Sequence, residues 1–553
     1  MAFEGAEPRG KAEAPALFLR NATGLVKGWS RFDAFLYSHF SVNFITLGFF
    51  FAIAALPFIP QGEVIPALIV TAVFVSFLVY AYATLISVMP RAGGDYVWQS
   101  RLLTPGLGFV LSVAGWWFIL WYWTPVYANI LDVEILQPIA AVFGGSSAVT
   151  WLSSDNGIFV TCVVTIALAA LFVSLGMRGY ARVQRYCFAI GGLVLLIMFL
   201  IMLFTSKDTF ISAFNSAAHN LFHGNGDVYH HTIAVAAKGN GYTAPTHPGL
   251  SPFFGQSMLL TPILCFWILW PTWGATLYGE VRGASDFRGV VRGMMSGLWS
   301  VFAIAIIFFF LAQKTFGWDF FNAANLNYES AVFGGHVAPT IPVWSYPPLL
   351  VSFLIPTAPL RALFLLAFGA WFIGWVGTLF LSSTRVIFAV AFDRILPERF
   401  SDVTTRHHVP VWGLLLMLVP AFVVGALYAY TDEFKTFVLD ATLVIAITFF
   451  GSLVAAAILP WRKRELFENS PVSRYRLAGV PVSTICAVLA AAFMGWNIYE
   501  WLTNPVYGVN NATSLIFMGA MYVLAIVIYV VSKLVRRRQG IDLDVVYKEI
   551  PVE

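Results

Sequence analysis

Residues 258–282, MLLTPILCFWILWPTWGATLYGEVR, form an apolar run that is long enough to cross a lipid bilayer. A span of about 20 apolar residues crosses the hydrocarbon core. The middle of the run reads Trp270-Pro271-Thr272-Trp273-Gly274, where Pro271 removes a backbone donor and Gly274 weakens a helix. Interrupted backbone at membrane depth persists only where it is buried in protein or lines a wet cavity. The stretch therefore predicts either a kinked helix repaired by its neighbours or one half of a transporter binding site.

The composition indicates a polytopic membrane protein. Of the 553 residues, 59% are hydrophobic and 11% are charged, whereas soluble domains carry about 25% charged residues. The four cysteines lie in apolar segments and form no CxxC pair, so we interpret them as packing residues and expect no metal site. The N-terminal residues lack the apolar core of a signal peptide. The sequence has no GxxxxGKS or GxxxxGKT loop, so we expect neither ATP hydrolysis nor another enzymatic activity.

The apolar segments predict twelve transmembrane helices. They lie at about residues 34–57, 64–89, 106–134, 156–176, 183–205, 258–280, 289–313, 360–388, 410–430, 434–459, 477–501 and 512–535. Residues 347–359 are also apolar, but they are few and rich in proline, so we interpret them as a surface or re-entrant segment before the eighth span.

The distribution of basic residues predicts the orientation of the chain. With the N-terminus inside, 27 of the 32 Lys and Arg residues lie on the cytoplasmic side and five lie outside. This bias satisfies the positive-inside rule. We therefore expect a multi-pass protein of the cell (plasma) membrane with both termini in the cytoplasm. We expect the lipid bilayer as a partner and no nucleic acid, and the sequence leaves the oligomeric state open.

The lengths of the connections favour two five-helix repeats. The long connection lies outside, between spans five and six, whereas the link between spans six and seven is short. An odd number of helices per repeat inverts the second copy, an arrangement found in many transporters. The predicted organisation is a cytoplasmic tail (1–33), a first five-helix repeat (34–205), an extracellular loop (206–257), a second, inverted repeat (258–459), two further helices (477–535) and a cytoplasmic tail (536–553).

The first span carries a candidate for the interruption that matches the one in span six. Asn43 and Thr46 are polar residues within an apolar segment, and Gly48 permits local unwinding. Each alone is also typical of helix packing in membranes. They indicate a break because their position in the first repeat is equivalent to that of the sixth-span break in the second repeat.

Three stretches resemble the amino acid–polyamine–organocation (APC) permeases. Residues 90–96, PRAGGDY, resemble the family's Pro-x-x-Gly-Gly-x-Tyr motif after span two. Residues 383–397, STRVIFAVAFDRILP, resemble its stretch after span eight, and Glu280 lies where the family has a Glu after its broken sixth helix. The resemblance implies an all-α, LeuT-type 5+5 inverted repeat with broken helices 1 and 6 plus two extra helices. It also implies proton- or sodium-linked transport, or exchange, of amino acids or related amines.

The sequence departs from the family pattern at the expected breaks. The family's Gly-x-Gly of the first helix is Thr46-Leu47-Gly48 here, and the sixth helix breaks near Trp270-Pro271-Thr272 instead of Gly-Phe-Glu. The family Gly of the span-eight stretch is Arg394. These differences bear on the substrate more than on the fold.

The resemblance places a substrate site at the two breaks. A substrate carboxylate would lie against backbone N–H groups near residues 46–48, and the amine would face carbonyls near Asn43 and residues 270–272. No Lys, Asp or Glu lies at mid-membrane, so we expect a neutral, zwitterionic amino acid, and the aromatic walls favour a bulky apolar side chain. Trp and Tyr also serve as packing residues and interface anchors. The candidate substrate-binding residues are Asn43, Thr46, Leu47, Gly48, Trp116, Trp123, Trp270, Pro271, Thr272, Trp273, Gly274 and Trp371.

The coupling ion is expected to be Na⁺ or H⁺, with no other cofactor. Many proton-linked relatives carry a Lys in span five, and the corresponding residue here is Gly191, which would leave a volume empty between spans one and eight. Hydroxyl oxygens there suit a hard cation, and the candidate cation site consists of Ser382, Ser383 and Thr384. Passive exchange or another proton route is the alternative, and helix packing is the structural explanation of the same hydroxyls.

Charged residues gather at the predicted inner ends of the spans. They are typical of a solvated basic inner face, but they also suit a gate of ion pairs that break during alternating access. The candidate inner-gate residues are Arg91, Asp95, Glu280, Arg282, Arg385 and Asp393.

The sequence favours a secondary active transporter, a symporter or exchanger, that moves an amino acid by alternating access. The alternatives are a polyamine or other organic-amine carrier, a transporter-like amino acid receptor without turnover, and a channel. Scattered Ser, Thr and Gly residues do not form the continuous polar stripe of a channel. Six histidines fall on the outer side, five of them in the long loop, and are expected to be solvated or to make a lid that responds to pH.

Overall fold

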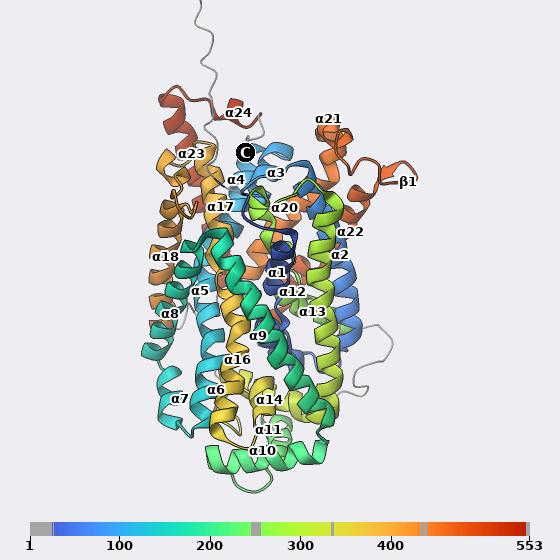
Figure 1. Ribbon diagram of the computed structural model, residues 1–553, viewed down its shortest axis with the longest axis vertical. Helices are drawn as coiled ribbons and strands as arrows, with labels where there is room; N and C mark the ends of the chain where they lie inside the picture. The colour runs from blue at the N-terminus through green and yellow to red at the C-terminus, as the bar shows by residue number, and fades with distance from the viewer. Residues whose placement is uncertain are drawn as a thin grey trace, which may run out of the picture.

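The twelve predicted membrane spans are confirmed in a computed structural model of the chain (Figure 1). The structure describes residue 25 and residues 27–244, 256–332, 337–431, 434 and 440–548. Within this part of the chain, twelve helical segments are long and apolar enough to cross a membrane. They are Arg31–Phe58, Val64–Val88, Pro105–Val142, Asp155–Ser174, Gly176–Phe204, Gln256–Glu280, Phe287–Thr315, Ala358–Phe392, Val411–Tyr430, Asp440–Arg462, Val482–Thr503 and Ala512–Arg538.

Eight of these segments are single helices. They are α2 (Val64–Val88), α8 (Asp155–Ser174), α9 (Gly176–Phe204), α13 (Phe287–Thr315), α18 (Val411–Tyr430), α20 (Asp440–Arg462), α22 (Val482–Thr503) and α23 (Ala512–Arg538). Their lipid-facing residues are apolar because no water is available in the bilayer core to solvate polar groups.

The other four segments are composite. The first contains α1 (Arg31–Val42), the π-helix η1 (Phe44–Ile53) and the 3-10 helix η2 (Leu56–Phe58), and the sixth contains α12 (Gln256–Ile268) and the 3-10 helix η5 (Trp273–Glu280). The eighth consists of α16 (Ala358–Val376) and α17 (Thr378–Phe392). The third consists of α4 (Pro105–Val113), η3 (Ala114–Phe118), α5 (Ile119–Leu131), η4 (Asp132–Leu136) and α6 (Gln137–Val142).

Spans one and six form the centre of the bundle. In each, 89% of the most apolar window is buried inside the protein, compared with 22% in the twelfth span. A span buried on all sides contacts protein rather than lipid, so it can tolerate interrupted backbone. The two most buried spans are therefore those in which the sequence predicts breaks.

Shorter elements cover both ends of the bundle. In Figure 1, α10, α11 and α14 lie at one end, and α3, α21 and α24 lie at the other. The bounds of the short elements are α3 (Asp95–Leu102), α7 (Ser146–Leu152), α10 (Lys207–Phe222), α11 (Val228–Gly239), α14 (Trp318–Val332), α15 (Pro347–Ser352), η6 (Glu398–Ser401), α21 (Arg464–Glu468), η8 (Pro505–Tyr507) and α24 (Leu543–Val546). The antiparallel strands β1 (Arg476–Leu477) and β2 (Val480–Pro481) form a small hairpin.

The connection predicted as an extracellular loop is largely helical where it is described. Ser206 caps α10 by accepting a hydrogen bond from the Thr209 N–H. Phe210, Phe214 and Ala218 recur at helical spacing and are all buried. The connection therefore contains two helices, α10 and α11, which the sequence analysis did not predict. Residues 245–255 lie outside the described part of the chain, as do tail residues 1–24, 26 and 549–553.

Two further segment predictions need correction. Residues 347–352 form α15, whose Leu349, Leu350 and Val351 are fully buried, so this segment does not lie on the surface. The eleventh span begins at Val482 and not at residue 477, because the preceding residues pair as β1 and β2. The third span also continues to Val142, eight residues beyond its predicted end.

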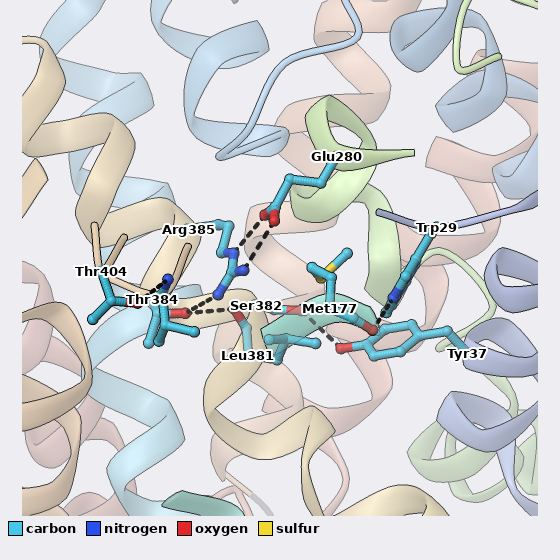
Figure 2. Close-up of polar contacts among 10 residues, drawn as sticks. Trp29, Tyr37, Met177, Glu280, Leu381, Ser382, Thr384, Arg385 and Thr404 are labelled. Carbon is cyan, nitrogen blue, oxygen red and sulfur yellow. Dashed lines mark hydrogen bonds and ion pairs between the residues drawn. The ribbon is translucent and has the colours of Figure 1, made fainter. Parts of the chain in front are cut away.

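The start of the first span is tied to the end of the sixth. The N–H groups of Gly28 and Trp29 donate to the carbonyl of Glu280 at 2.9 and 3.3 Å, and the Arg282 N–H donates to the Trp29 carbonyl at 3.0 Å. The Trp29 indole donates to the Met177 carbonyl at 2.7 Å (Figure 2). Part of the predicted N-terminal tail is thus packed against the bundle.

Candidate functional site

Asn43 separates α1 from η1 in the first span. Its backbone has a φ of 30° and a ψ of 80°, a left-handed conformation that Asn tolerates better than most residues. Its side-chain oxygen accepts the Thr46 N–H at 3.3 Å, and its side-chain nitrogen donates to the Trp371 carbonyl at 3.2 Å. Asn43 therefore caps the second helical piece and anchors the interruption to span eight.

The sixth span is interrupted between Ile268 and Trp273. The Trp273 N–H turns back to the Trp270 carbonyl at 3.0 Å, and the Ser38 hydroxyl of α1 donates to the Pro271 carbonyl at 2.9 Å. The Thr272 hydroxyl is buried and has no hydrogen-bond partner among the described residues. The predicted residues of this stretch, including Gly274, are all buried. Helix α1, which ends at the first interruption, thus contacts the second interruption.

A small cavity of about 10 Å³ lies beside the two interruptions, with room for about one water molecule. Trp123 stands perpendicular to Trp270, with ring centres 5.9 Å apart, and Trp270 is 5.4 Å from Trp273. Tyr127 stacks on Trp375 at 3.5 Å. Aromatic rings therefore occupy the place where a substrate side chain would have to fit. The lining residues are Ser41, Leu47, Trp123, Tyr127, Trp270, Trp273, Trp375 and Thr378.

The structure brings four of the predicted binding residues to this cavity, namely Leu47, Trp123, Trp270 and Trp273. Asn43, Thr46 and Gly48 are buried in the first span next to it. Trp116 does not line the cavity but packs against Trp273, which does, with their ring centres 4.6 Å apart. Whether these residues bind substrate stays a prediction.

Trp371 does not line the cavity. Its indole donates to the Gly191 carbonyl at 3.1 Å, and its ring centre lies 5.6 Å from that of His39. A Cβ added at Gly191 would lie 2.8 Å from the Trp371 ring, so glycine is required at this close approach. The volume that was expected to be empty at Gly191 is therefore filled by an indole. Trp375, one helical turn further, takes the position in the cavity that was predicted for Trp371.

The three hydroxyls predicted to hold a cation do not converge. Ser382 donates to the Trp273 carbonyl at 3.1 Å and lies 3.2 Å from the Tyr37 hydroxyl (Figure 2). Ser383 and Thr384 donate to carbonyls of their own helix, those of Leu379 and Leu381. Consecutive residues of a helix point about 100° apart, so these side chains face different neighbours. Whether these residues contribute ligands to a cation stays a prediction.

Two buried ion pairs include three of the predicted inner-gate residues, namely Glu280, Arg385 and Asp393. Arg385 makes a bidentate pair with Glu280, with distances of 2.7 and 3.1 Å (Figure 2), and both side chains are at most 2% exposed. Arg101 pairs with Asp393 at 2.6 and 2.7 Å, and both side chains are fully buried. The bidentate geometry provides two charge-assisted hydrogen bonds in each pair.

The remaining predicted gate residues have other roles. Asp95 is buried and accepts hydrogen bonds from Tyr82, Ser452 and Trp116, so it belongs to no ion pair among the described residues. Arg282 is exposed and donates to the Lys27 carbonyl at 3.2 Å. Arg91 donates to the Pro90 carbonyl at 3.1 Å. Of the six predicted gate residues, Glu280, Arg385 and Asp393 thus belong to buried ion pairs. Asp95 accepts hydrogen bonds from uncharged donors, and Arg91 and Arg282 donate to backbone carbonyls.

The Gly-Gly pair of residues 90–96 fits the loop between two buried elements. Gly93 and Gly94 have φ angles of 88° and 37°, which side chains rarely adopt. The Gly93 N–H donates to the Thr276 carbonyl at 2.9 Å, and a Cβ at Gly94 would lie 2.9 Å from the backbone of Ala275. The loop therefore packs against η5, the second part of span six.

Replacing Gly94 by alanine is expected to destabilise the protein by about 1–3 kcal/mol, because the new Cβ meets backbone that cannot move aside and the φ is unfavourable. Thermal denaturation in detergent measures the effect. Gly192→Ala is the control, because nothing lies within 4 Å of its added Cβ and alanine favours a helix, so it should not lower the melting temperature. Equal melting temperatures for the two variants would contradict the close approach at Gly94.

The comparison with known proteins identifies the family. A sequence model described as "Amino acid permease" matches residues 42–542. The chain belongs to the amino acid permease family. It is also similar to the branched-chain amino acid permease BcaP of Lactococcus lactis subsp. cremoris. The two are 21% identical over 475 residues, which cover 83% of this permease and 85% of the relative. The resemblance to APC permeases is thereby confirmed, and the family indicates amino acid transport across a membrane rather than an enzyme.

Sequence reasoning missed several residues of the permease's interior. Thr378 follows Trp375 and could have been found from its position on the same face, since Trp371, Trp375 and Thr378 have the spacing i, i+4, i+7. Arg101 was counted only as a cytoplasmic basic residue, although it pairs with Asp393. Tyr547 of the C-terminal tail is buried, with its hydroxyl 3.0 Å from that of Tyr96. No feature of the tail sequence indicated this contact.

Proposed function

We propose that this permease is a secondary active transporter, a symporter or exchanger, that moves a neutral amino acid with an apolar side chain by alternating access. The observation that carries the proposal is the aromatic cavity beside two interrupted spans. None of its eight lining residues is charged. A dicarboxylate, a dibasic amino acid or a polyamine would require a buried counter-charge, because an unpaired charge is costly to bury. The lining therefore favours a substrate whose only charges are its amino and carboxyl groups.

The ends of the short helices supply groups for the substrate backbone. The first N–H groups of a helix and its last carbonyls have no intrahelical partners. Here, η1 starts at Phe44 and α1 ends at Val42, so a positive and a negative helix end lie next to each other. We propose that the carboxylate binds at the start of η1, near Thr46 to Gly48, and that the amine binds carbonyls near Asn43 and Pro271.

The proposed architecture is a LeuT-type 5+5 inverted repeat with broken helices 1 and 6 and two further helices. It is supported by the interruptions at Asn43 and at residues 269–272, and by the burial of these two spans at the centre. We propose a location in the cell (plasma) membrane with both termini in the cytoplasm, because 27 of 32 basic residues fall on that side. The buried pairs Arg385–Glu280 and Arg101–Asp393 would then form the inner gate.

The side chain of the substrate is proposed to be branched and apolar. The relative BcaP is named a branched-chain amino acid permease. A cavity of Trp, Tyr and Leu side chains removes apolar surface from water but offers few hydrogen bonds to a polar side chain. A cavity of about 10 Å³ is too small for a leucine side chain, so its indoles must move when such a group enters.

The purified protein is therefore expected to catalyse exchange of leucine in liposomes loaded with unlabelled leucine. Uptake of labelled leucine is measured, with isoleucine, valine, glutamate, lysine and spermidine as competitors. We expect competition by isoleucine and valine and none by the charged compounds. Binding of leucine without exchange would indicate a receptor, and inhibition by spermidine alone would indicate an amine carrier. Either result would refute the proposal.

A further inference from the structure

Asp95 is a buried carboxylate that no positive charge neutralises. Its Oδ1 accepts hydrogen bonds from the Tyr82 and Ser452 hydroxyls, both at 2.5 Å, and its Oδ2 accepts the Trp116 indole N–H at 3.1 Å. The side chain is fully buried, and its donors come from α2, α20 and η3. Among the described residues, no Lys, Arg or His bonds to it. Three neutral donors around a lone buried carboxylate suit a group that exchanges a proton.

The titratable groups of the elements packed around Asp95 leave it as the group free to change charge. Tyr82 of α2 faces it directly. On its own helix, Arg101 is paired with Asp393 of α17, and Tyr96 donates to the same Asp393 at 2.8 Å. The other charged residues nearby, Arg385 of α17 and Glu280 of η5, pair with each other. α4 has no titratable residue, and the titratable residues of α20, Asp440 and Arg462, lie at its two ends, at least ten residues from Ser452.

Burial raises the pKa of Asp95 to about 6, because the charged form loses its hydration, while the hydrogen bonds from Ser452, Tyr82 and Trp116 partly offset the rise. A group with this pKa is about nine-tenths protonated at pH 5 and about one-tenth protonated at pH 7. Small changes of pH on either side of the membrane therefore change its charge.

The donor types determine which oxygen takes the proton. An indole N–H can only donate, so Oδ2 must remain an acceptor while Trp116 stays in place. A hydroxyl can turn and accept, so the proton goes to Oδ1, and Tyr82 or Ser452 then accepts it. The proton comes from water and returns to water, and no other bond is made or broken. Protonation leaves the Trp116 bond in place but removes its charge assistance, which roughly halves its strength.

Trp116 connects Asp95 to the cavity. Its ring centre lies 4.6 Å from that of Trp273, which lines the cavity and belongs to the interrupted sixth span. Because the cavity holds only about one water molecule, a substrate side chain requires Trp273 and its neighbours to move. Ionised Asp95 holds Trp116 more firmly and so opposes this movement. Neutral Asp95 opposes it less.

We propose that Asp95 is the proton-binding residue of this permease and that, through Trp116, a proton and an amino acid bind with positive cooperativity. The inference rests on the proposed transport of a neutral amino acid. By linkage, substrate favours the protonated form of Asp95 by the same factor as the proton favours substrate. Asp95 is a positioning residue in this scheme, because it acts on the substrate through Trp116 and not by direct contact.

The test measures leucine affinity of the purified protein between pH 5 and pH 8. We expect the wild type to bind leucine at least about fivefold more tightly at pH 5 than at pH 8, with the change centred near pH 6. Asp95→Asn should bind with the acid-form affinity at every pH, because an amide oxygen accepts from Trp116 and its NH₂ group donates to Tyr82 and Ser452 as the neutral acid does. Asp208→Asn, an exposed carboxylate of α10, should retain the wild-type pH profile.

A second variant keeps the test decisive if Asp95→Asn does not fold. Trp116→Phe removes the indole N–H but keeps a ring against Trp273, so its affinity should depend less on pH than that of the wild type. In liposomes, the wild type should accumulate leucine when the outside is acidic, equally well in Na⁺ and in K⁺, whereas Asp95→Asn should exchange leucine without accumulating it.

Each outcome distinguishes the two proposals. A wild type that binds no neutral amino acid would refute the proposed function. Leucine binding that is independent of pH in the wild type, or a full pH dependence in Asp95→Asn or Trp116→Phe, would overturn the role of Asp95 and leave the transport function standing.

Discussion

Replacing Arg385 by methionine is expected to lower the free energy of unfolding by about 3–5 kcal/mol and to abolish amino acid transport. The Arg385 and Glu280 side chains are at most 2% exposed, so removing the cation leaves a buried carboxylate without its bidentate partner. The loss exceeds the net value of the pair, because it includes the cost of an uncompensated buried charge. Denaturation in detergent and leucine exchange in liposomes measure the two effects.

Two control variants distinguish a loss of stability from a loss of the ion pair's role in transport. The double variant Arg385→Met/Glu280→Met removes both charges and should regain most of the stability, because apolar side chains of similar size can replace a buried pair. It should remain inactive if the pair must open and close during transport. Arg31→Met breaks a pair with Asp286 in which the arginine is 64% exposed, and should cost at most about 1 kcal/mol. Equal losses for Arg31→Met and Arg385→Met would contradict the buried pair.

Replacing Trp123 by alanine is expected to weaken leucine binding by at least about tenfold, which corresponds to about 1.4 kcal/mol. Trp123 lines the cavity and stands perpendicular to Trp270. Truncation of a large aromatic residue at the centre of a binding site typically has effects of this size or larger. A smaller side chain also enlarges the cavity, so phenylalanine or tryptophan should compete better with leucine than in the wild type.

Trp117→Ala is the matched control for this variant. Both indoles belong to span three, both are at most 5% exposed, and neither indole N–H has a hydrogen-bond partner among the described residues. Both truncations should cost about 3–5 kcal/mol of stability, since each removes a buried Trp. Trp117 does not line the cavity, so leucine affinity should stay at the wild-type value. Unchanged affinities for all amino acids in Trp123→Ala would exclude Trp123 from the binding site.

Much of the fold follows from local sequence features. Apolar runs identify the spans because the bilayer imposes one length on all of them. The interruptions are predictable where a residue cannot continue a helix, as at Pro271, or tolerates a left-handed backbone, as Asn43 does. The helices of residues 206–239 could also have been found, since their buried aromatic residues recur at helical spacing.

The partners within the site could not be predicted in the same way. Arg385 and Glu280 are 105 residues apart in the sequence, and Arg101 and Asp393 are 292 residues apart. Only the packing of the spans therefore decides which charged residues form ion pairs. The rotation of α16 about its axis likewise decides that Trp375 faces the cavity and Trp371 faces Gly191. The hydrogen bonds of the hydroxyls at 382–384 also depend on this packing, since Ser382 reaches Tyr37 and Trp273 in other spans while Ser383 and Thr384 bond within their own helix.

The backbone hydrogen bonds between residues 28–29 and residues 280–282 have a mechanical consequence. They join the start of span one to the end of span six, so the segment before Asn43 and the segment after Pro271 are coupled through their backbones. Two segments joined in this way move together, so a tilt of one segment pulls the other with it. Any tilt of this end of span six would carry Glu280 away from Arg385 of span eight, so the buried ion pair would have to break in the same movement.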